Sequence, residues 1–451
     1  MTPGEAMHAL ARRLWPLNRS LSGEGVRQTL AILSEYLPGL QVHEIPSGSA
    51  CFDWTVPREW RVREAWVKNA AGEKVIDFAA NNLHLMGYST PVAAEMPLAE
   101  LQAHLHSLPE SADAIPYVTS YYQERWGFCL SQFERDRLAP GHYRVHIDSE
   151  LFAGSLTYGE WRIPGETDRE ILLSTYVCHP SMANNELSGP CVVTWLARWL
   201  LEQSTRRYGY RILFLPETIG SICYLSRHLE ELKARVAAGF VVTCVGDERT
   251  YSYLPSRQGD SLADRVALHV LRHTEPAFQR YTFLDRGSDE RQYCSPGVDL
   301  PVCSLMRSKY ATYPEYHTSL DDLNLVTPAG LEGGYTALRR ALECLEQDCI
   351  PRATTPCEPQ LGKRGLYPTL STRESGLQVR DMMNLLAYAD GHHSLLEIAE
   401  IISVPMWTLV PLARKLAEHG LLEIRHFEGK EKDKQRSPDA AQRNPGRKAV
   451  T

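Results

Sequence analysis

The sequence lacks three features that would each have pointed to a class of protein. Its 11 cysteines in 451 residues include no Cys-x-x-Cys pair, which argues against zinc ribbons and thioredoxin motifs. No uninterrupted apolar run approaches the roughly 18 residues of a membrane span. The N-terminus lacks the basic start, apolar block and small-residue cleavage site of a signal peptide. We therefore expect a cytoplasmic protein without a membrane partner.

The chain also lacks an excess of positive charge. Its formal net charge is -7, so bulk charge gives no reason to expect nucleic-acid or membrane binding. Several cysteines, including Cys178 and Cys244, lie inside apolar runs and are expected to be reduced and buried. With 43% hydrophobic and 23% charged residues the composition is that of a soluble globular protein, long enough for two or three domains.

The middle of the chain alternates between strands and helices. Continuous apolar runs at 171–177, 210–215 and 238–245 predict strands, and helical patterns follow the first two at 191–201 and about 219–236. This alternation is typical of a mainly parallel sheet with helices on both faces. In such sheets functional residues gather at the carboxyl ends of the strands.

The regions before and after this alternating segment have different sequence patterns. Residues 5–36 predict two helices, whereas alternating stretches separated by Gly, Pro and Asn turns make about residues 48–156 β-rich. A linker is expected after Pro351, through Thr354-Thr355-Pro356, to about Gly365. Residues 378–427 then predict three helices and a hairpin, which is a winged-helix shape. The tail from Gly429 is polar and expected to be disordered.

Candidate chemistry begins where the first strand ends. His179 follows that strand, and Glu186 follows it by seven residues, just before a helix. Imidazole and carboxylate are ligand types that zinc takes, so the two side chains could meet one metal ion across the loop. The alternative is a polar loop with a capping Ser and a hydrogen-bonded His.

Glu217 ends the second strand. A buried carboxylate needs a partner. Glu217 is either the neighbour of a helix N-cap or a general base whose pKa is raised toward neutral pH by desolvation. Two further polar loops, Gly287–Tyr293 and Tyr313–Asp322, contain Asp289 and His317.

The order of these elements resembles a known family. His179 with an Asn-rich Ser-Gly loop, then Glu-x-x-Gly-Ser, Gly-Ser-Asp and Tyr-His-Thr-x-x-Asp, is similar to the zinc exopeptidases of the M28 aminopeptidase type over about residues 160–345. The closer likeness is to a branch with an inserted β domain of the DUF2172/DUF4910 type and a C-terminal winged helix, associated with polysaccharide biosynthesis.

That resemblance implies an α/β fold with a mainly parallel or mixed sheet, helices on both faces, and two added domains. The implied divisions are a discontinuous zinc aminopeptidase-like domain, an inserted β-rich domain, a winged-helix domain and a disordered tail. The aminopeptidase-like domain comprises residues 1–47 and 157–353, and the inserted β-rich domain comprises residues 48–156. The winged-helix domain comprises residues 366–428, and the tail comprises residues 429–451.

The chain departs from the M28 pattern at its acids. Asn185 stands where M28 enzymes carry a metal-bridging Asp, Thr218 follows Glu217 where a second acid is usual, and Thr243-Cys244 replaces a third. An amide or hydroxyl cannot supply the charge that holds two dications. The resemblance therefore implies one zinc.

The implied roles of the remaining residues complete this hypothesis. The best ligand set is His179, Glu186 and His317, leaving one zinc position open. Asp289 and Asn185 are each either a reserve zinc ligand or a residue that orients a ligand. Glu217 is the general base. The residues considered for the oxyanion or a substrate carboxylate, or equally for structural salt bridges, are Tyr316, Arg257 and Arg291.

The expected function is a zinc-dependent hydrolase of an amide bond, most of all an aminopeptidase-like exopeptidase, with a peptide or an aminoacyl or acyl amide as substrate. The alternatives are an amidohydrolase or deacylase in polysaccharide or small-molecule biosynthesis, and a catalytically reduced ligand-binding protein. The inserted domain is expected to cover the active-site mouth, or else to support a homo-oligomer. The third helix of the winged-helix unit has only two basic residues, Arg414 and Lys415, so we expect a packing module rather than nucleic-acid binding.

Overall fold

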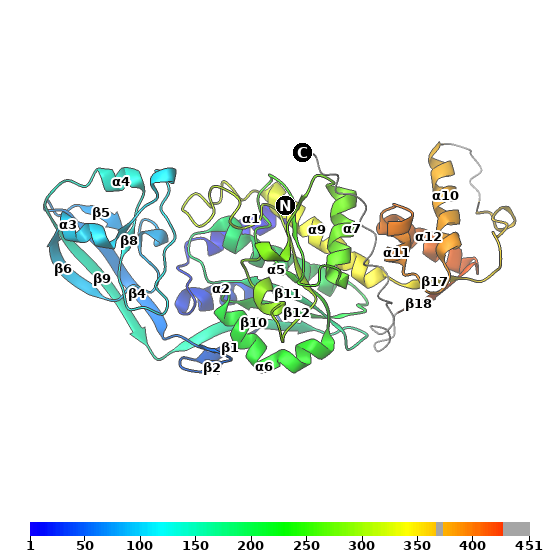
Figure 1. Ribbon diagram of the computed structural model, residues 1–451, viewed down its shortest axis with the longest axis horizontal. Coiled ribbons are helices and arrows are strands. Elements are labelled where there is room, and N and C mark those ends of the chain that lie inside the picture. Colours follow the sequence, from blue (N-terminus) through cyan, green and yellow to red (C-terminus); the bar gives the residue numbers. More distant parts are fainter. Residues whose placement is uncertain (367–372, 427–451) are drawn as a thin grey trace, which may run out of the picture.

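The computed structural model describes residues 1–366 and 373–426. Three parts follow one another along the long axis of the molecule: a β-rich part, a central α/β part and a helical C-terminal part (Figure 1). The predicted disordered tail, residues 429–451, lies outside the described residues.

The central part is built on one mixed sheet of eight strands, in the order β1-β10-β12-β11-β13-β16-β14-β15. The four strands β12, β11, β13 and β16 run parallel at its centre, and antiparallel pairs flank them. The strands are β1 (Gln41–Pro46), β10 (Ser155–Ile163), β11 (Glu170–Tyr176), β12 (Gly209–Leu215), β13 (Val236–Val241), β14 (Ser252–Leu254), β15 (Gln279–Arg280) and β16 (Val302–Met306). The predicted mixed α/β sheet is confirmed.

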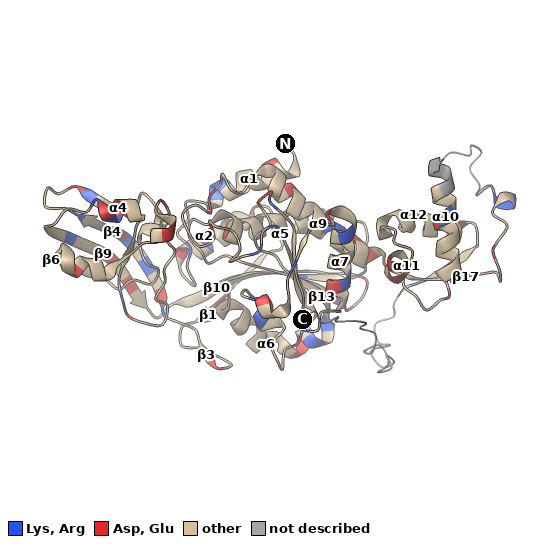
Figure 2. Ribbon diagram, turned by 45° about the horizontal axis from the view of Figure 1, so that its top comes forward, with Lys and Arg blue, Asp and Glu red and all other residues tan. Residues whose placement is uncertain are grey.

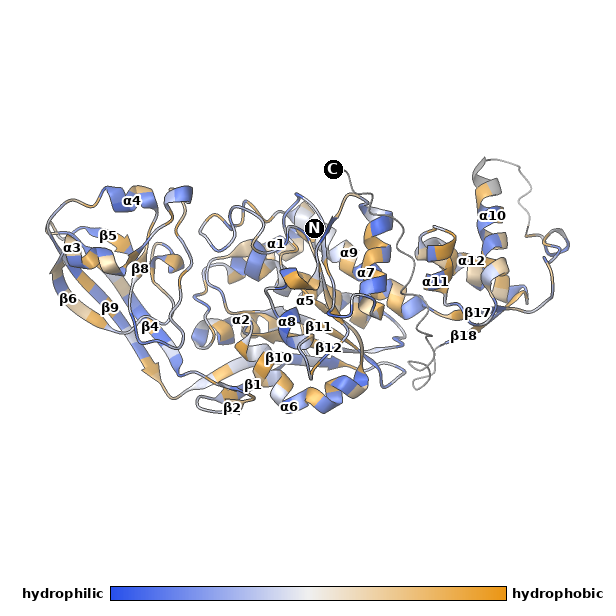
Figure 3. Ribbon diagram, in the orientation of Figure 1, coloured by the Kyte–Doolittle hydropathy of each residue, from blue (hydrophilic) through white to orange (hydrophobic). Residues whose placement is uncertain are grey.

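Helices cover both faces of this sheet because its central strands are apolar on both sides. Ile171 and Leu173 of β11 pack in one core and Leu172 in the other. The first face is covered by α1 (Pro3–Leu14), α2 (Glu24–Ser34), α5 (Ser188–Glu202), α7 (Leu262–Thr274) and α9 (Pro328–Gln347). The second is covered by α6 (Ile219–Arg235) and α8 (Glu290–Tyr293). Hydrophobic and hydrophilic residues alternate along α6 and α7, as one-sided burial requires (Figure 3).

A second sheet lies within residues 48–156. Its order is β5-β4-β9-β6, and all its neighbours are antiparallel. Its strands are β4 (Glu59–Lys68), β5 (Lys74–Asp77), β6 (Val92–Pro97) and β9 (His142–Phe152). Shorter elements of this segment are β2 (Ala50–Cys51), β3 (Trp54–Thr55), β7 (Leu105–His106), β8 (Phe128–Cys129), α3 (Leu98–Leu101) and α4 (Gln132–Asp136).

The C-terminal part contains α10 (Arg373–Tyr388), α11 (Leu395–Ile401) and α12 (Met406–Glu418), followed by strand β18 (Leu422–Arg425). The partner of β18 is β17 (Ile350–Ala353), which precedes the helices. Residues 352–353 were predicted to begin a linker, so this part of the prediction is wrong. The winged helix thus takes one strand of its hairpin from the chain that directly follows α9.

Within residues 1–366 and 373–426 no single helix is long and apolar enough to cross a membrane, and α11 with α12 passes that test only as a pair bent by 119°. Acidic and basic residues are interspersed over the helices of the molecule (Figure 2). The helix α12 carries only Arg414, Lys415 and Glu418 as charged residues.

Candidate active site

The structure brings together the side chains that follow the two central strands β11 and β12. His179 lies three residues beyond the end of β11, and Glu217 lies two residues beyond β12. His179 Nε2 is 3.6 Å from Glu217 Oε2. His179 is buried, whereas Glu217 is half-buried and accessible from solvent. The carboxyl edge of the sheet therefore holds an imidazole and a carboxylate face to face.

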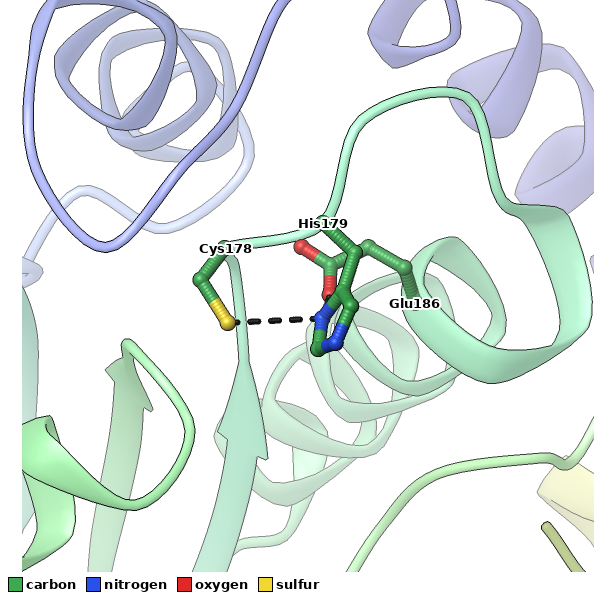
Figure 4. A group of neighbouring side chains, drawn as sticks. All are labelled: Cys178, His179 and Glu186. Carbon is green, nitrogen blue, oxygen red and sulfur yellow. Dashed lines mark hydrogen bonds and ion pairs between the residues drawn. The ribbon is translucent and has the colours of Figure 1, made fainter. Parts of the chain in front are cut away.

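Glu186 lies on the opposite side of the His179 ring. His179 Nδ1 and Glu186 Oε2 share a hydrogen bond of 2.9 Å, and Cys178 Sγ lies 3.3 Å from the same nitrogen (Figure 4). Burial raises the pKa of Glu186 to about 8 and lowers that of His179 to about 3. A proton held on Nδ1 leaves the Nε2 lone pair directed toward Glu217. Glu186 thus lies on the Nδ1 side of the His179 ring, whereas Glu217 lies on the Nε2 side.

Arg19, which the sequence analysis did not single out, completes this buried arrangement. Its Nε donates to the carbonyl oxygen of His179 at 3.0 Å and lies 3.4 Å from Glu186 Oε1. The side chains of Arg19 and Glu186 are fully buried. Arg19 opens the stretch Arg-Ser-Leu-Ser-Gly-Glu-Gly, 160 residues before His179 in the chain, and no local pattern connects the two.

The loop between His179 and α5 contains a single π-helical turn, Ala183–Leu187. Asp321 holds this turn, because its carboxylate accepts the backbone N–H groups of Asn184 at 2.6 Å and Asn185 at 3.0 Å. Asn185 Nδ2 in turn donates to the hydroxyl of Tyr176 at 2.9 Å. Among residues 1–366 and 373–426 no hydrogen-bond partner is present for the buried Asn185 Oδ1. π-Turns are frequent at functional sites.

The turn after β12 is held by Asp289. Asp289 Oδ1 accepts the N–H of Thr218 at 2.7 Å and the hydroxyl of Ser221 at 2.8 Å. Burial and the nearby charge of Asp289 raise the pKa of Glu217. The exposed Arg291 donates to Thr218 Oγ1 at 2.7 Å and so stands at the rim beside Glu217.

His317 faces His179 across the site, with 5.4 Å between the ring centroids. Tyr316 stacks on the His317 ring at 3.9 Å. Burial and the neighbouring His179 lower the pKa of His317 to about 3, so the ring is neutral at physiological pH. The buried His317 Nε2 has no hydrogen-bond partner within the part of the chain that the structure describes.

The β-rich segment contributes a tyrosine to this site, which the sequence analysis missed. The Tyr117 ring lies 5.2 Å from both the His179 and the His317 rings. Its backbone N–H donates to the carbonyl oxygen of His317 at 2.9 Å. Ser319 N and Oγ bond the backbone of Ile115 at 2.9 and 3.0 Å. No local motif marks Tyr117, because only the folded chain brings it to residues 317–319.

The hydrogen bonds between Ile115 and Ser319 support a testable prediction. Ser319→Ala removes the acceptor of the Ile115 N–H, which is part-buried. We expect a loss of about 1–3 kcal/mol in the free energy of unfolding, the cost of leaving a buried donor unpaired. Urea denaturation measures it. Ser226→Ala is the matched control, since within the described residues the Ser226 hydroxyl bonds only groups of its own helix α6, the carbonyl of Cys223 and the exposed guanidinium of Arg227. Equal losses in both variants would contradict a stabilising role for the Ser319–Ile115 bonds.

Four non-glycine residues at or near this site have a positive φ. Ser181, Thr218, Cys244 and His317 have φ of 44°, 65°, 52° and 56°, in the left-handed region. Thr218 is β-branched, which makes this conformation especially costly. Such strain persists where the surrounding structure enforces it and clusters at active sites.

The residues present can be tested for their fit to a metal ion. Cys178, His179 and Glu186 offer ligand atoms within 4.8 Å of one another. That trio fits poorly, because the guanidinium of Arg19 already lies beside Glu186 and a dication there would face a like charge. The Nε2 side of His179 fits better. A carboxylate oxygen lies 3.6 Å from Nε2, and the ring of a second neutral imidazole, His317, lies 5.4 Å from the His179 ring. Among the described residues, His317 Nε2, Asn185 Oδ1 and Asp289 Oδ2 are buried without a hydrogen-bond partner, as is Glu186 Oε1.

Two of the three residues predicted for substrate contacts lie at this site. Tyr316 and Arg291 stand at its rim. Arg257 instead pairs with Asp299, with 2.8 Å between Nη2 and Oδ2.

Comparison with known sequences places this arrangement in a family. Residues 8–348 match the family described as Domain of unknown function (DUF4910), and residues 349–424 match a winged helix-turn-helix. The chain belongs to the DUF4910 family. The predicted family branch and the predicted C-terminal winged helix are thereby confirmed.

Relatives of this DUF4910 chain extend over almost its full length. A Clostridium acetobutylicum protein, whose name refers to polysaccharide biosynthesis and an aminopeptidase-like domain, is 46% identical over 398 residues, covering 88% of this chain and 91% of the relative. A crystal structure from Clostridium acetobutylicum, named for a peptidase, is 43% identical with a TM-score of 0.88, covering 93% of this chain and 96% of the other. The zinc aminopeptidase of Bacillus subtilis has 13% identity and a TM-score of 0.55, covering 75% and 94%. The fold is aminopeptidase-like.

Proposed function

We propose that the chain is a zinc-dependent hydrolase of an amide bond with a single zinc, and that its action is aminopeptidase-like. The observation that carries this proposal is the facing pair at the sheet edge, His179 Nε2 and Glu217 Oε2 at 3.6 Å. The ring of His317 lies 5.4 Å from that of His179, and its Nε2 has no hydrogen-bond partner among the described residues. The zinc aminopeptidase fold of distant structures supports it.

His179 and His317 would hold the ion through their Nε2 atoms, and Asn185 Oδ1 would be the third protein donor. Glu186 would orient His179 through Nδ1, as carboxylates commonly do behind a metal-bound imidazole. This assignment replaces Glu186 as a ligand. When bound, zinc supplies Lewis-acid polarisation of the amide carbonyl.

A single ion follows from the residues that stand where M28 enzymes carry acids. Asn185, Thr218 and Cys244 are neutral, and burial raises the pKa of the Cys244 thiol further. Two adjacent dications require bridging negative charge, which these side chains do not supply.

Glu217 would act as the general base. Its carboxylate is half-buried and faces the site, so it can accept the proton of the attacking water and return it to the leaving amine. Asp289 fixes the turn that aims it. The rim residues Arg291 and Tyr316 would hold the substrate, a peptide or an aminoacyl or acyl amide.

A second candidate is an amidohydrolase or deacylase acting on an acylated amino sugar. It uses the same residues and differs in substrate. The name of the Clostridium acetobutylicum relative, which refers to polysaccharide biosynthesis, favours it.

Metal analysis of the purified protein, together with a substrate panel, tests the proposal. After zinc loading and dialysis we expect close to one zinc per chain and hydrolysis of either aminoacyl amides or N-acyl amino sugars. Two retained equivalents would contradict the single-ion argument. The absence of both zinc and hydrolysis would contradict the proposed function.

A further inference from the structure

A pocket of about 180 Å³ lies within the β-rich segment, and all the residues that line it fall between Pro57 and Leu151. Three consecutive residues of one loop, Tyr121, Tyr122 and Gln123, line it, with Tyr88 and Leu151 opposite them. Pro57, Arg58 and Glu124 complete its lining. Tyr88 is fixed by a hydrogen bond of 2.6 Å to Ser22.

Two tyrosines connect this pocket with the proposed metal centre. Tyr121 lines the pocket, and its hydroxyl is 2.5 Å from the hydroxyl of Tyr117. The Tyr117 ring contacts both His179 and His317. Both tyrosines are half-buried, so both line solvent-accessible space. A chain of direct side-chain contacts, from Tyr121 through Tyr117 to the two imidazoles, therefore links the pocket to the proposed metal centre.

The lining combines aromatic faces with charged and amide groups. Tyr88, Tyr121 and Tyr122 supply rings, while Arg58 and Glu124 form an ion pair and Gln123 supplies an amide. Tyr122 is 54% exposed, and the Trp54 ring, 41% exposed, lies 5.9 Å from it. Exposed aromatic residues gathered beside a pocket mark a binding site more often than chance exposure does.

This combination favours a sugar ring over an apolar peptide side chain. A pyranose presents C–H groups on its faces, which pack on aromatic rings, and hydroxyls on its edge, which bond to carboxylate, guanidinium and amide groups. An apolar side chain would make no hydrogen bond to Arg58 or Glu124. Its aliphatic contacts in the pocket would be limited to Pro57 and Leu151. The size also agrees, since a cavity of about 150 Å³ accommodates a benzene ring.

We propose that this pocket is a subsite for one sugar ring, so that the substrate class is an acylated or aminoacylated amino sugar. The proposal rests on the proposed hydrolase function for the chemistry, but the binding it requires does not depend on zinc. It also gives the β-rich segment a role in selecting the substrate.

Saturation-transfer NMR and calorimetry with N-acetylglucosamine on zinc-free full-length protein test the subsite. We expect a Kd on the order of 1 mM, as about −0.3 kcal/mol per heavy atom gives for a small ligand. Tyr122→Ala should weaken binding about tenfold, through loss of one ring contact. Phe133→Ala, an exposed aromatic of α4 outside the pocket, should leave the Kd unchanged.

The outcomes separate this proposal from the hydrolase proposal. Sugar binding that Tyr122→Ala weakens and His317→Ala leaves intact supports the subsite, even if no hydrolysis occurs. Hydrolysis of aminoacyl amides without any sugar binding would overturn the subsite and leave the hydrolase standing. Equal sugar binding in the Tyr122→Ala and wild-type proteins, or tighter binding of N-acetyl-phenylalaninamide in the same pocket, would also overturn it.

Discussion

Glu217→Gln should lower turnover by about 10²–10⁴-fold while zinc stays bound. General acid–base catalysis contributes about this much to an enzymatic rate. The glutamine keeps the shape of the side chain and its hydrogen bonding but cannot accept a proton. Because the proposed ligands are His179, His317 and Asn185, metal content should be unchanged. Metal analysis, melting temperature and hydrolysis of the best substrate, measured on this one variant, separate loss of the base from loss of the metal.

Glu315→Gln is the matched control for this experiment. Glu315 lies two residues from His317, but its carboxylate pairs with Arg249 at 2.7 Å. It should retain activity to within about twofold, because a part-exposed ion pair contributes little to stability. If Glu217→Gln loses zinc in proportion to activity, Glu217 is a ligand. If its activity survives, Glu217 only supports the turn before α6.

His317→Ala and, separately, His179→Ala should each abolish zinc retention. Either change leaves one imidazole and one neutral amide, too few donors for a tight tetrahedral site. The wild-type protein should also gain stability with zinc, by about 2.7 kcal/mol at a free zinc concentration 100 times its Kd, and neither variant should. Zinc content after dialysis and thermal unfolding with and without zinc measure both effects.

His419→Ala provides the control, because His419 is exposed at the end of α12. It should keep full zinc content and the full stabilisation. A variant of His179 or His317 that retains one zinc per chain would show that the ligand assignment is wrong.

The location of the site was predictable because it depends on a topological rule. Continuous apolar runs marked β11 and β12 as central strands, and parallel neighbours end at the same edge of a sheet. The sequence therefore placed His179 and Glu217 together without any knowledge of side-chain geometry. The structure finds them 3.6 Å apart.

The direction in which side chains point was not predictable in the same way. Spacing alone put Glu186 within reach of a metal on His179, but which ring nitrogen it meets depends on the π-turn that Asp321 holds. Tyr117 lies 200 residues before His317, and no periodicity connects them. The strand β17 was missed because Pro351 suggests the start of a linker. Proline is nevertheless tolerated in an edge strand, and both strands of a two-stranded sheet are edge strands.

The β-rich segment leaves and re-enters the central sheet at one point. Pro46 of β1 is the register partner of Ser155 of β10, and the Ser47 N–H donates to the carbonyl of Gly154 at 2.9 Å. The segment therefore occupies the place of a hairpin turn between β1 and β10. The pairing of these two strands within the central sheet brings the two ends of the segment together. A module joined in this way adds little chain-closure entropy to the fold of its host. Such a junction allows the host sheet to accept or exchange the inserted segment as a unit, while the strands on both sides keep their register.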